Sequence, residues 1–471
     1  MSTMKALKAL DNNTSAKVFI VGGYVRDLLR NKLSDTPDLD IVVCKVSFKR
    51  LIKLLEPYGQ VKEVPIAKTN DLFNIKVLLF KAKDDILEAQ ITLPRRGKNN
   101  IFNKSNTLKQ DARHRDFTIN ALYLPINYTS KDEIIDFVGG IKDLDNGVLR
   151  AVKNAESRLK ESPIRIMRAI SLAARTEFSL DPDLYKAIKE NIQLLNKVPI
   201  ETFTNEFNDV ILSSKPSKYI KLMEKVGILK LFIPELQACV GVTQEIKFHK
   251  YDVFNHVIKA CDNVKPDLVL RLAALLHDIG KPRVKEVMQN GRITFHKHEH
   301  ASTELAYKLL KRLKYDNSTI KRVTKLISLH MYHYVRDFTD AAVRRFIIKA
   351  GITEKDIANN FKDFELFELR KADRLGNGFK NIAVTPKQLD FQARLKQVFL
   401  ASNGHDTKDL SIDGSILMEE FELKPGPFIG EILKFLLDNV LEDPNLNNEE
   451  SLLKLSKKFI SEQGDKNFST K

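Results

Sequence analysis

The distribution of hydrophobic positions along the chain changes near residue 150. Before it, short apolar runs such as NIKVLLFKA and DILEAQITL are separated by turn residues, which predicts a small mixed sheet flanked by helices. After it, segments such as SPIRIMRAISLAART and ELAYKLLKRLKY repeat apolar residues at helical spacing. The polar, basic stretch from residue 94 to 111 predicts a mobile loop. The pattern therefore predicts the α+β class, with a small mixed-sheet head followed by an all-α remainder.

Two carboxylates stand out in the segment VFIVGGYVRDLLRNKLSDTPDLDIVV, which reads as strand, glycine turn, short helix, loop and second strand. Asp38 and Asp40 are two residues apart on the second strand, so their side chains face the same way. Like charges held this close repel each other unless a cation lies between them. Mg²⁺ prefers one or two carboxylates together with substrate phosphates. The pair therefore predicts a magnesium site.

The first half of the same segment predicts an anion site. Gly22 and Gly23 end an apolar strand and expose backbone N–H groups at the start of the helix that carries Arg26 and Asp27. The N-terminus of a helix that follows glycines attracts phosphate groups. A phosphate cradle beside a carboxylate pair indicates nucleotidyl transfer.

The string GGYVRD, followed by DLD on an apolar strand, resembles the signature of the tRNA nucleotidyltransferase and bacterial poly(A) polymerase family. This family is the class II branch of the DNA polymerase beta-like nucleotidyltransferases. DARHRDFTINALYL is similar to the family's RRDFTINA motif, DFVGG to its D-x-x-G-G turn, and ESPIRIMRA to a helix that reads close to EDxxRxxRA. The resemblance implies that Asp38 and Asp40 are catalytic and hold Mg²⁺. The nucleotide-binding residues that it implies are Gly22, Gly23, Arg26, Asp27, Arg113, Arg115, Asp116, Asn120, Glu161, Arg165 and Arg168.

The sequence departs from the family's pattern at several positions. In the family, the Asp of EDxxRxxRA and the first Arg pair with the Watson–Crick edge of the incoming base. Here the Asp is replaced by Ser162, which leaves open whether Glu161 or a water supplies the missing acceptor. Gln90 stands where the family often has an acidic residue, and Thr202 stands in place of an Arg in the neck helix.

A second set of polar residues lies in the helical half. FNHVIKACD, LLHDIGKP, TFHKHEHAS, LISLHM and RKADRLG supply a series H, HD, H, H, D that resembles the HD phosphohydrolase superfamily. Six N and O groups from several helices can hold one or two transition metals. The predicted ligands are His256, His277, Asp278, His298, His330 and Asp373, with His296, His300 and His333 as alternates. The expected metal is Ni²⁺, Co²⁺ or Mn²⁺.

Composition and charge agree with this interpretation. The formal net charge of +16 and a pI near 9.4 favour an anionic macromolecular partner. Three cysteines, Cys44, Cys239 and Cys261, have no spacing typical of disulfides or zinc sites, which predicts a reducing compartment. The sequence contains no run of eighteen apolar residues, so we expect no membrane span and a cytoplasmic protein.

The resemblance implies a CCA tRNA nucleotidyltransferase that adds CMP and AMP to tRNA 3′ ends by two-metal catalysis, with tRNA, CTP and ATP as partners. It also implies a second, metal-dependent phosphohydrolase activity. The expected domains are a nucleotidyltransferase head at 16–150, a neck and body at 151–240, an HD domain at 241–380 and a C-terminal helical module at 381–460. A poly(A) polymerase, a CC-adding or A-adding enzyme, an HD phosphohydrolase with an inactive head and a non-catalytic RNA-binding protein stay open as alternatives.

Overall fold

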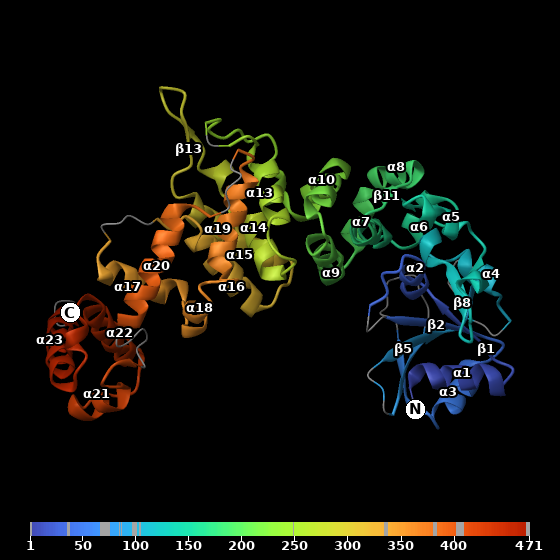
Figure 1. Cartoon of the computed structure of the whole chain (residues 1–471), viewed down its shortest axis with the longest axis horizontal. Helices are drawn as coiled ribbons and strands as arrows, with labels where there is room; N and C mark the ends of the chain where they lie inside the picture. Colours follow the sequence, from blue (N-terminus) through green and yellow to red (C-terminus); the bar gives the residue numbers. More distant parts are fainter. Residues whose placement is uncertain are drawn as a thin grey trace. The chain divides into compact units, whose positions relative to one another are not determined.

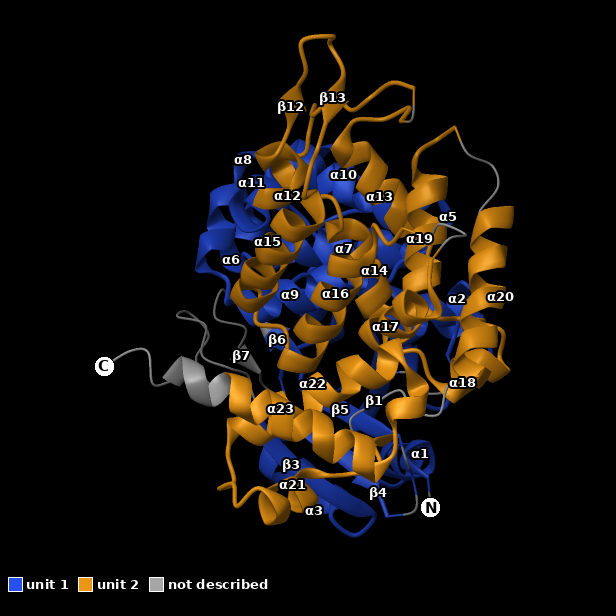
Figure 2. Ribbon diagram, turned by 90° about the vertical axis from the view of Figure 1, so that its left-hand side faces the viewer, with its two compact units in different colours: residues 1–234 blue, residues 235–471 orange. Residues whose placement is uncertain are grey.

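The computed structural model describes residues 2–34, 38–65, 76–83, 85, 87–96, 101, 102, 105–247, 249–333, 338–379, 384–401 and 409–467. Figure 1 labels the elements along the chain. The chain divides into two compact units, residues 1–234 and residues 235–471, which have different colours in Figure 2.

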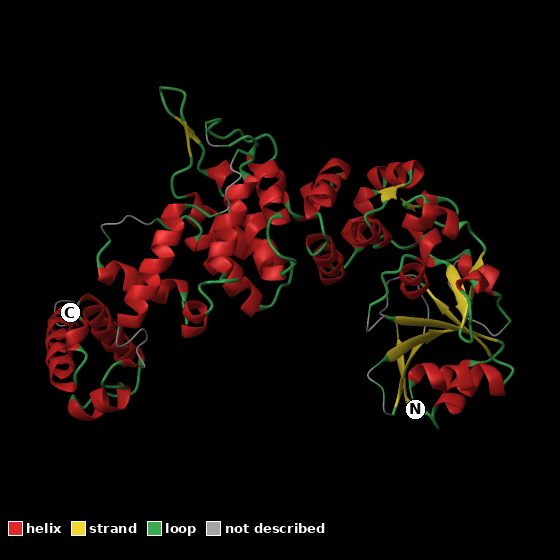
Figure 3. Cartoon of the chain, in the orientation of Figure 1, coloured by secondary structure: helices red, strands yellow, loops and turns green. Residues whose placement is uncertain are grey.

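Unit 1 contains a seven-stranded mixed sheet (Figure 3). Its strands follow the order β3-β4-β5-β2-β1-β8-β9, with β2 and β5 parallel and the other neighbours antiparallel. The strands are β1 Lys17–Val21, β2 Leu39–Cys44, β3 Gly59–Pro65, β4 Lys76–Ala82, β5 Glu88–Thr92, β8 Leu122–Pro125 and β9 Ile135–Asp136. Because β4 and β5 lie within the two apolar runs NIKVLLFKA and DILEAQITL, the predicted mixed sheet is confirmed.

Side-chain alternation along β2 separates the core from the polar face of the sheet. Leu39, Ile41 and Val43 belong to one hydrophobic core with residues of helices α1 (Thr3–Asn13) and α3 (Phe48–Leu55). Successive side chains of a strand point to opposite faces. Asp40 therefore points away from this core, to the face that carries the candidate site.

The rest of unit 1 is mainly helical. It contains α2 Gly23–Leu29, α4 Leu108–Ala112, η1 Thr118–Asn120, η2 Lys131–Glu133, α5 Gly140–Asp145, α6 Ala155–Glu161, α7 Arg165–Thr176, α8 Pro182–Glu190, η3 Ile192–Lys197, α9 Ile200–Ile211, α10 Pro216–Val226 and α11 Ile228–Phe232. Two short strands, β10 Val148–Leu149 and β11 Ser179–Leu180, pair in parallel. Helix α7 packs against α9 and α10.

The ESPIRIMRA segment does not form one continuous helix. Helix α6 ends at Glu161, Ser162 has an extended backbone with φ −151° and ψ 94°, and α7 begins at Arg165. Pro163 explains the break, because proline lacks an N–H and disfavours helical dihedrals in the residue before it.

The prediction of one loop over residues 94–111 is wrong in part. β6 (Arg95–Arg96) pairs with β7 (Ile101–Phe102), and α4 begins at Leu108. Thr107 and Gln110 form a capping box that starts this short helix. Residues 97–100, 103 and 104 of the expected loop lie outside the described residues.

Unit 2 consists almost entirely of helices. They are α13 Val253–Asp262, α14 Leu268–Leu276, η4 Lys281–Arg283, α15 His298–Arg312, α16 Asn317–Leu329, α17 Asp340–Ala350, α18 Glu354–Ala358, α19 Glu365–Gly376, α20 Pro386–Ala401, α21 Gly414–Glu420, α22 Pro427–Glu442, η6 Pro444–Leu446 and α23 Glu449–Asn467. A hairpin of β12 (Glu286–Val287) and β13 (Ile293–Thr294) interrupts them, and α12 (Pro234–Gln237) spans the boundary between the units. Helices α13, α14, α16 and α19 pack together, whereas α21, α22 and α23 share a separate core.

The predicted α+β class, with a sheet near the N-terminus and helices after it, is confirmed. Among the described residues, no helix combines the length and the apolar character that crossing a membrane requires.

Candidate functional site

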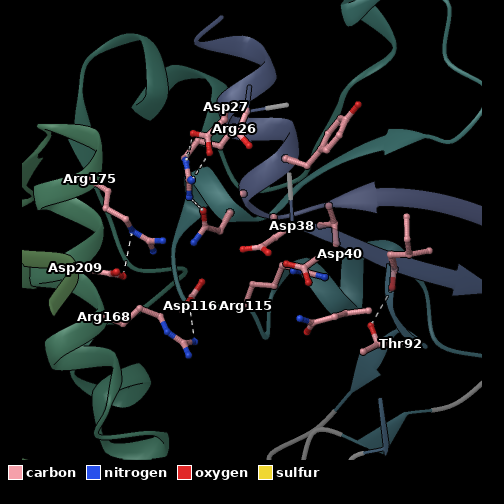
Figure 4. A pocket seen from close by; sticks show the side chains of 18 of the residues that line it. Arg26, Asp27, Asp38, Asp40, Thr92, Arg115, Asp116, Arg168, Arg175 and Asp209 are labelled. Carbon is pink, nitrogen blue, oxygen red and sulfur yellow. Dashed lines mark hydrogen bonds and ion pairs between the residues drawn. The ribbon is translucent and has the colours of Figure 1, made fainter. Parts of the chain in front are cut away.

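Asp38 and Asp40 line a cavity of unit 1 (Figure 4). Asp40 lies in β2, opposite Val21 of β1 on one side and Gln90 of β5 on the other. Asp38 directly precedes β2 and is exposed. The cavity has a volume of about 730 Å³. It is large enough for a nucleoside triphosphate, because small-molecule sites in proteins measure roughly 300–1,000 Å³.

Gly22 lies against the Asp40 carboxylate. Its backbone has φ 78° and ψ −137°, a conformation that L side chains rarely adopt. A Cβ atom at this position would lie 2.9 Å from Oδ2 of Asp40. The glycine turn is therefore required both for its backbone conformation and for the close approach of the chain to Asp40.

Electrostatics around Asp40 favour a bound cation. Burial raises the pKa of Asp40; the Arg115 guanidinium lowers it, and the neighbouring Asp38 raises it again. A divalent cation at this partly buried carboxylate would offset its charge together with that of the neighbouring Asp38. Because oxygen ligands of this kind suit a hard divalent ion, the donor set fits Mg²⁺.

Arg26 orients two of the predicted nucleotide-binding residues. Its Nε and Nη2 donate to Oδ1 and Oδ2 of Asp27 at 2.9 and 2.7 Å. Its Nη1 donates to Oδ1 of Asn120 at 2.8 Å. Because that oxygen already accepts from Arg26, the amide N–H groups are what Asn120 can offer to a ligand.

The buried carboxylate of Asp111 holds Arg95 and Arg115, the two arginines that form the basic wall of the cavity. Sequence reasoning missed Asp111. Oδ1 accepts from Nε of Arg95 at 3.0 Å, and Oδ2 accepts from Nε of Arg115 at 2.9 Å and from the Tyr123 hydroxyl at 2.6 Å. Burial alone raises the pKa of Asp111, but Arg115 and Arg95 outweigh burial and hold it well below its usual range. The available signal was an acid four residues before an arginine in DARHRD.

Helices α7 and α9 bring acid–arginine pairs to the cavity, on the side away from Asp40 in Figure 4. Nη1 of Arg168 lies 3.4 Å from Oδ2 of Asp116, and its Nε lies 3.5 Å from Oε1 of Glu206. Oε2 of Glu206 accepts from the hydroxyl of Ser171. Burial raises the pKa of Asp116, but the nearby Arg168 and Arg165 outweigh burial and lower it.

Arg175 of α7 and Asp209 of α9 form a second acid–arginine pair. Nε of Arg175 lies 3.6 Å from Oδ2 of Asp209, and both residues line the cavity. Sequence reasoning did not assign a role to Arg175, Glu206 or Asp209. Arg175 follows Arg168 by seven residues on α7, which was the only local signal that both share one face of this helix.

Most of the predicted site residues of unit 1 are brought together. Those that line the cavity are Gly22, Gly23, Arg26, Asp27, Asp38, Asp40, Arg115, Asp116, Asn120, Arg165 and Arg168. Arg113 is exposed and Glu161 is held by Arg158 and Arg165, and neither lines the cavity. Ser162 does not line it either, because the break between α6 and α7 takes residues 161 and 162 out of the helix that faces it.

The DFVGG segment forms a turn outside the cavity. Oδ1 of Asp136 accepts from the backbone N–H groups of Val138 and Gly139 at 2.9 Å each. Gly139 has φ 81° and ψ 26°, and a Cβ atom there would meet nothing within 4 Å. The motif shapes the connection into α5.

The six predicted metal ligands of unit 2 converge. They come from α13 (His256), the residues directly after α14 (His277 and Asp278), the start of α15 (His298), the end of α16 (His330) and α19 (Asp373). Oδ2 of Asp278 lies 3.3 Å from Nε2 of both His256 and His277. Its Oδ1 lies 3.2 Å from Nε2 of His298 and 3.8 Å from Nε2 of His330. Asp278 thus connects two groups of ligand atoms.

The outer nitrogen of three imidazoles is fixed by the backbone. Nδ1 of His277, His298 and His330 lies 2.9, 2.9 and 2.6 Å from the carbonyl oxygen three residues earlier in each case. A carbonyl oxygen can only accept, so Nδ1 donates to it and Nε2 is the ring nitrogen that faces the cluster. Oδ1 of Asp278 is buried and has no hydrogen-bond partner among the described residues. These features fit a transition metal.

The cluster has two kinds of imidazole. Burial lowers the pKa of His330 to about 3, with a further contribution from His277. Burial also lowers the pKa of His277, but Asp278 and Asp373 outweigh burial and raise it to about 10. A cation that displaces this proton would bind to neutral nitrogen and ionised oxygen ligands, so metal binding releases a proton.

A cavity of about 710 Å³ opens onto this cluster. Its cationic lining residues are Lys281, Arg292, Arg370, Arg374 and Lys387. Lys281 is buried, with Nζ 2.6 Å from Oδ2 of Asp278. Positive charge around buried metal ligands favours an anionic substrate.

The structure separates the predicted histidines from their alternates. His296 and His333 line the cavity but are exposed, and His300 is an exposed partner of Glu299. His249 also lines the cavity, with its ring centroid 5.3 Å from that of His256, and sequence reasoning missed it.

Comparison with known proteins gives matches over most of the chain. Residues 18–150 match the "Poly A polymerase head domain", residues 177–239 the "Probable RNA and SrmB- binding site of polymerase A", and residues 295–455 the tRNA nucleotidyltransferase domain 2. An A-adding tRNA nucleotidyltransferase of Deinococcus radiodurans is 30% identical over 344 residues, which cover 70% of this chain and 75% of that protein. A CCA-adding enzyme of Streptococcus thermophilus is 27% identical over 459 residues, which cover 95% of each chain.

Solved structures show the same architecture. The Bacillus stearothermophilus CCA-adding enzyme in complex with CTP superimposes with a TM-score of 0.64, covers 98% of both chains and is 17% identical. At this identity the likeness establishes the fold.

Proposed function

Because the chain belongs to the tRNA nucleotidyltransferase and poly(A) polymerase family, we propose that it adds CMP and AMP to the 3′ end of tRNA. The observation that carries this proposal is the cavity in which Asp38 and Asp40 face a basic wall and the acid–arginine pairs of α7 and α9. Its relatives include CCA-adding enzymes that match almost the full chain. The proposed partners are tRNA, CTP and ATP, and the proposed compartment is the cytoplasm.

In the proposed reaction, the chain supplies position and charge. Arg115, fixed by Asp111, neutralises phosphate oxygens, while Asn120, fixed by Arg26, donates to a sugar hydroxyl. Asp38 and Asp40 would hold two Mg²⁺ ions, which supply activation of the primer 3′-hydroxyl and neutralise the triphosphate as pyrophosphate leaves. Arg168 adds positive charge on the far side of the cavity.

A matrix of primers and nucleotides tests this function. The purified chain with Mg²⁺ is given tRNA that lacks CCA, CA or A, with each nucleoside triphosphate separately. The proposal expects CMP on the first two primers and AMP on the third. Absence of incorporation on all three primers would refute it.

An A-adding enzyme is the second candidate. Its support is the A-adding tRNA nucleotidyltransferase of Deinococcus radiodurans, a relative that shares 30% identity over 344 residues, together with the replacement of the family's base-pairing Asp by Ser162. The same matrix separates the candidates, since an A-adding enzyme extends only the tRNA that lacks the terminal A. A poly(A) polymerase would continue beyond one AMP.

For unit 2 we propose a second, metal-dependent phosphohydrolase activity. The six converging residues, the fixed Nε2 positions and the buried Oδ1 of Asp278 support a site for Ni²⁺, Co²⁺ or Mn²⁺. When bound, such an ion supplies an activated water for phosphoester hydrolysis. Lys281 and the other cationic lining residues would hold the phosphate.

Metal analysis and hydrolysis assays test the second site. The proposal expects one or two transition-metal ions per chain and hydrolysis of phosphoesters such as 2′,3′-cyclic phosphates. A chain that binds no transition metal would refute it. On this proposal, the domains are the head at 16–150, the neck and body at 151–240, the HD domain at 241–380 and the C-terminal module at 381–460.

A further inference from the structure

We propose that Glu206 and Arg168 together read the hydrogen-bonding edge of the incoming base. The inference rests on the proposed nucleotide addition. It assigns base selection to a pair formed between helices α7 and α9, in place of the residues at 161 and 162.

The geometry first excludes the acceptors that the sequence offered at positions 161 and 162. Ser162 and Glu161 do not line the cavity. The Glu161 carboxylate is occupied by Arg158 and by Arg165, whose Nη1 lies 3.3 Å away. Arg165 itself is buried, and its Nη1 also donates to the carbonyl oxygen of Arg158 at 2.9 Å. A base edge in the cavity would find no free acceptor at these positions.

Glu206 and Arg168 offer both an acceptor and donors within the cavity. Ser171 donates to Oε2 of Glu206 and thereby fixes the carboxylate, while Oε1 faces Nε of Arg168 at 3.5 Å. Nη1 of Arg168 lies 3.4 Å from Oδ2 of Asp116, and the Arg168 side chain is 45% exposed. Both contacts are longer than a charge-assisted hydrogen bond of about 2.7–2.9 Å, so each group keeps capacity for a ligand.

The chemistry of this pair matches two of the four bases. A carboxylate only accepts and a guanidinium only donates. Cytosine and adenine present an exocyclic amine as donor next to a ring nitrogen as acceptor, which complements the pair. Uracil and guanine present a carbonyl oxygen where the amine would be, and that oxygen would face the carboxylate. The pair therefore selects C and A and rejects U and G.

The position of the pair agrees with this role. Asp116 lies 3.4 Å from Nη1 of Arg168 and lines the same cavity as Arg115, Asp38 and Asp40. A nucleotide whose triphosphate lies at Asp40 would extend its base toward Arg168, which lies on the opposite side of the pocket from Asp40 in Figure 4.

The test compares Glu206→Gln with the unchanged chain on tRNA that lacks CCA or the terminal A. The measured quantities are the ratios of kcat/KM for CTP over UTP and for ATP over GTP, because the members of each pair have the same ring system and differ at this edge. The amide introduces a donor that a carbonyl oxygen can accept. We expect both ratios to fall by about 10- to 100-fold, the effect of one mismatched buried hydrogen bond.

Three further variants make the outcome decisive. Glu201→Gln is the matched control, because Glu201 lies on the same helix, is exposed and does not line the cavity; its ratios should equal those of the unchanged chain. Ser171→Ala frees the Glu206 carboxylate and should lower the ratios in the same direction by a few-fold, which keeps the test available should Glu206→Gln fail to fold. Ser162→Asp should leave the ratios unchanged.

A purely structural role for Glu206 would reduce incorporation of all four nucleotides equally. Unchanged ratios in Glu206→Gln or Ser171→Ala, or sharper ratios in Ser162→Asp, would overturn this inference while the proposed function stands. A chain that adds no nucleotide to any primer before substitution would refute both.

Discussion

Replacing Gly22 by Ala should damage nucleotide addition far more than it damages the fold. The methyl group would lie 2.9 Å from Oδ2 of Asp40, well inside ordinary van der Waals contact. Either the carboxylate or the glycine turn must move to relieve this contact. A displacement of a reacting group by about 1 Å costs roughly 100-fold in rate, so we expect kcat/KM to fall by about two orders of magnitude.

The stability cost is smaller and can be separated. Ala must adopt φ 78° and ψ −137°, for which backbone strain of about 1–3 kcal/mol is typical. The Tm would fall by about 2–4 °C for each kcal/mol in a unit of this size. Gly139→Ala is the matched control, since Gly139 also has a positive φ but no atom within 4 Å of its Cβ position. It should lose about 1 kcal/mol and keep its activity.

The assay measures AMP and CMP incorporation into tRNA well below the Tm, together with thermal unfolding of both variants. If Gly22→Ala keeps activity within three-fold of the unchanged chain while its Tm falls, then the close contact between Gly22 and Asp40 does not position the reacting centre. Equal losses of activity in both glycine variants would likewise contradict the reasoning, because Gly139 lies outside the cavity.

The remaining predictions concern Asp40, Asp111 and the proposed metal site of unit 2. Asp40→Ala should abolish nucleotide addition and leave tRNA binding nearly intact in a filter-binding assay, because the basic surface stays; wild-type-like incorporation would remove the central claim. His277→Ala with Asp278→Ala should abolish phosphoester hydrolysis and bound transition metal while sparing nucleotide addition, and loss of both activities together would argue against two sites. Because the folded-state pKa of Asp111 is lowered by Arg115, its contribution to stability is present above the unfolded pKa of about 3.9 and is lost as pH falls. Asp111→Asn should therefore flatten the Tm profile below pH 4, and an unchanged slope would contradict this.

The strand and glycine signals determined much of the candidate site in advance. A period of two predicted Asp38 and Asp40 on one face, and both line the cavity although β2 begins at Leu39. The proposed cluster of unit 2 was equally accessible, since the LLHDIGKP motif and the order of the four other residues along the chain identified them. The structure brings these six residues within a few ångströms of one another.

Interactions between distant segments were beyond the sequence pattern. The role of Asp111 depends on its hydrogen bonds with Arg95 of β6 and Tyr123 of β8, which are distant from it in the sequence. The pairing of Glu206 with Arg168 depends on the packing of α9 against α7.

The sequence by itself indicated the α+β class, the Asp38 and Asp40 pair at the start of β2, the glycine turn before α2 and the six residues of the proposed HD cluster, because each follows from a local period or a short motif. Only the tertiary structure decided which side chains complete the nucleotide cavity. Pro163 ends α6 and removes Glu161 and Ser162 from the cavity, and α9 supplies Glu206 in their place. Helical periodicity says which face of a helix is apolar, whereas the neighbour that covers that face is set by side-chain packing across the whole unit.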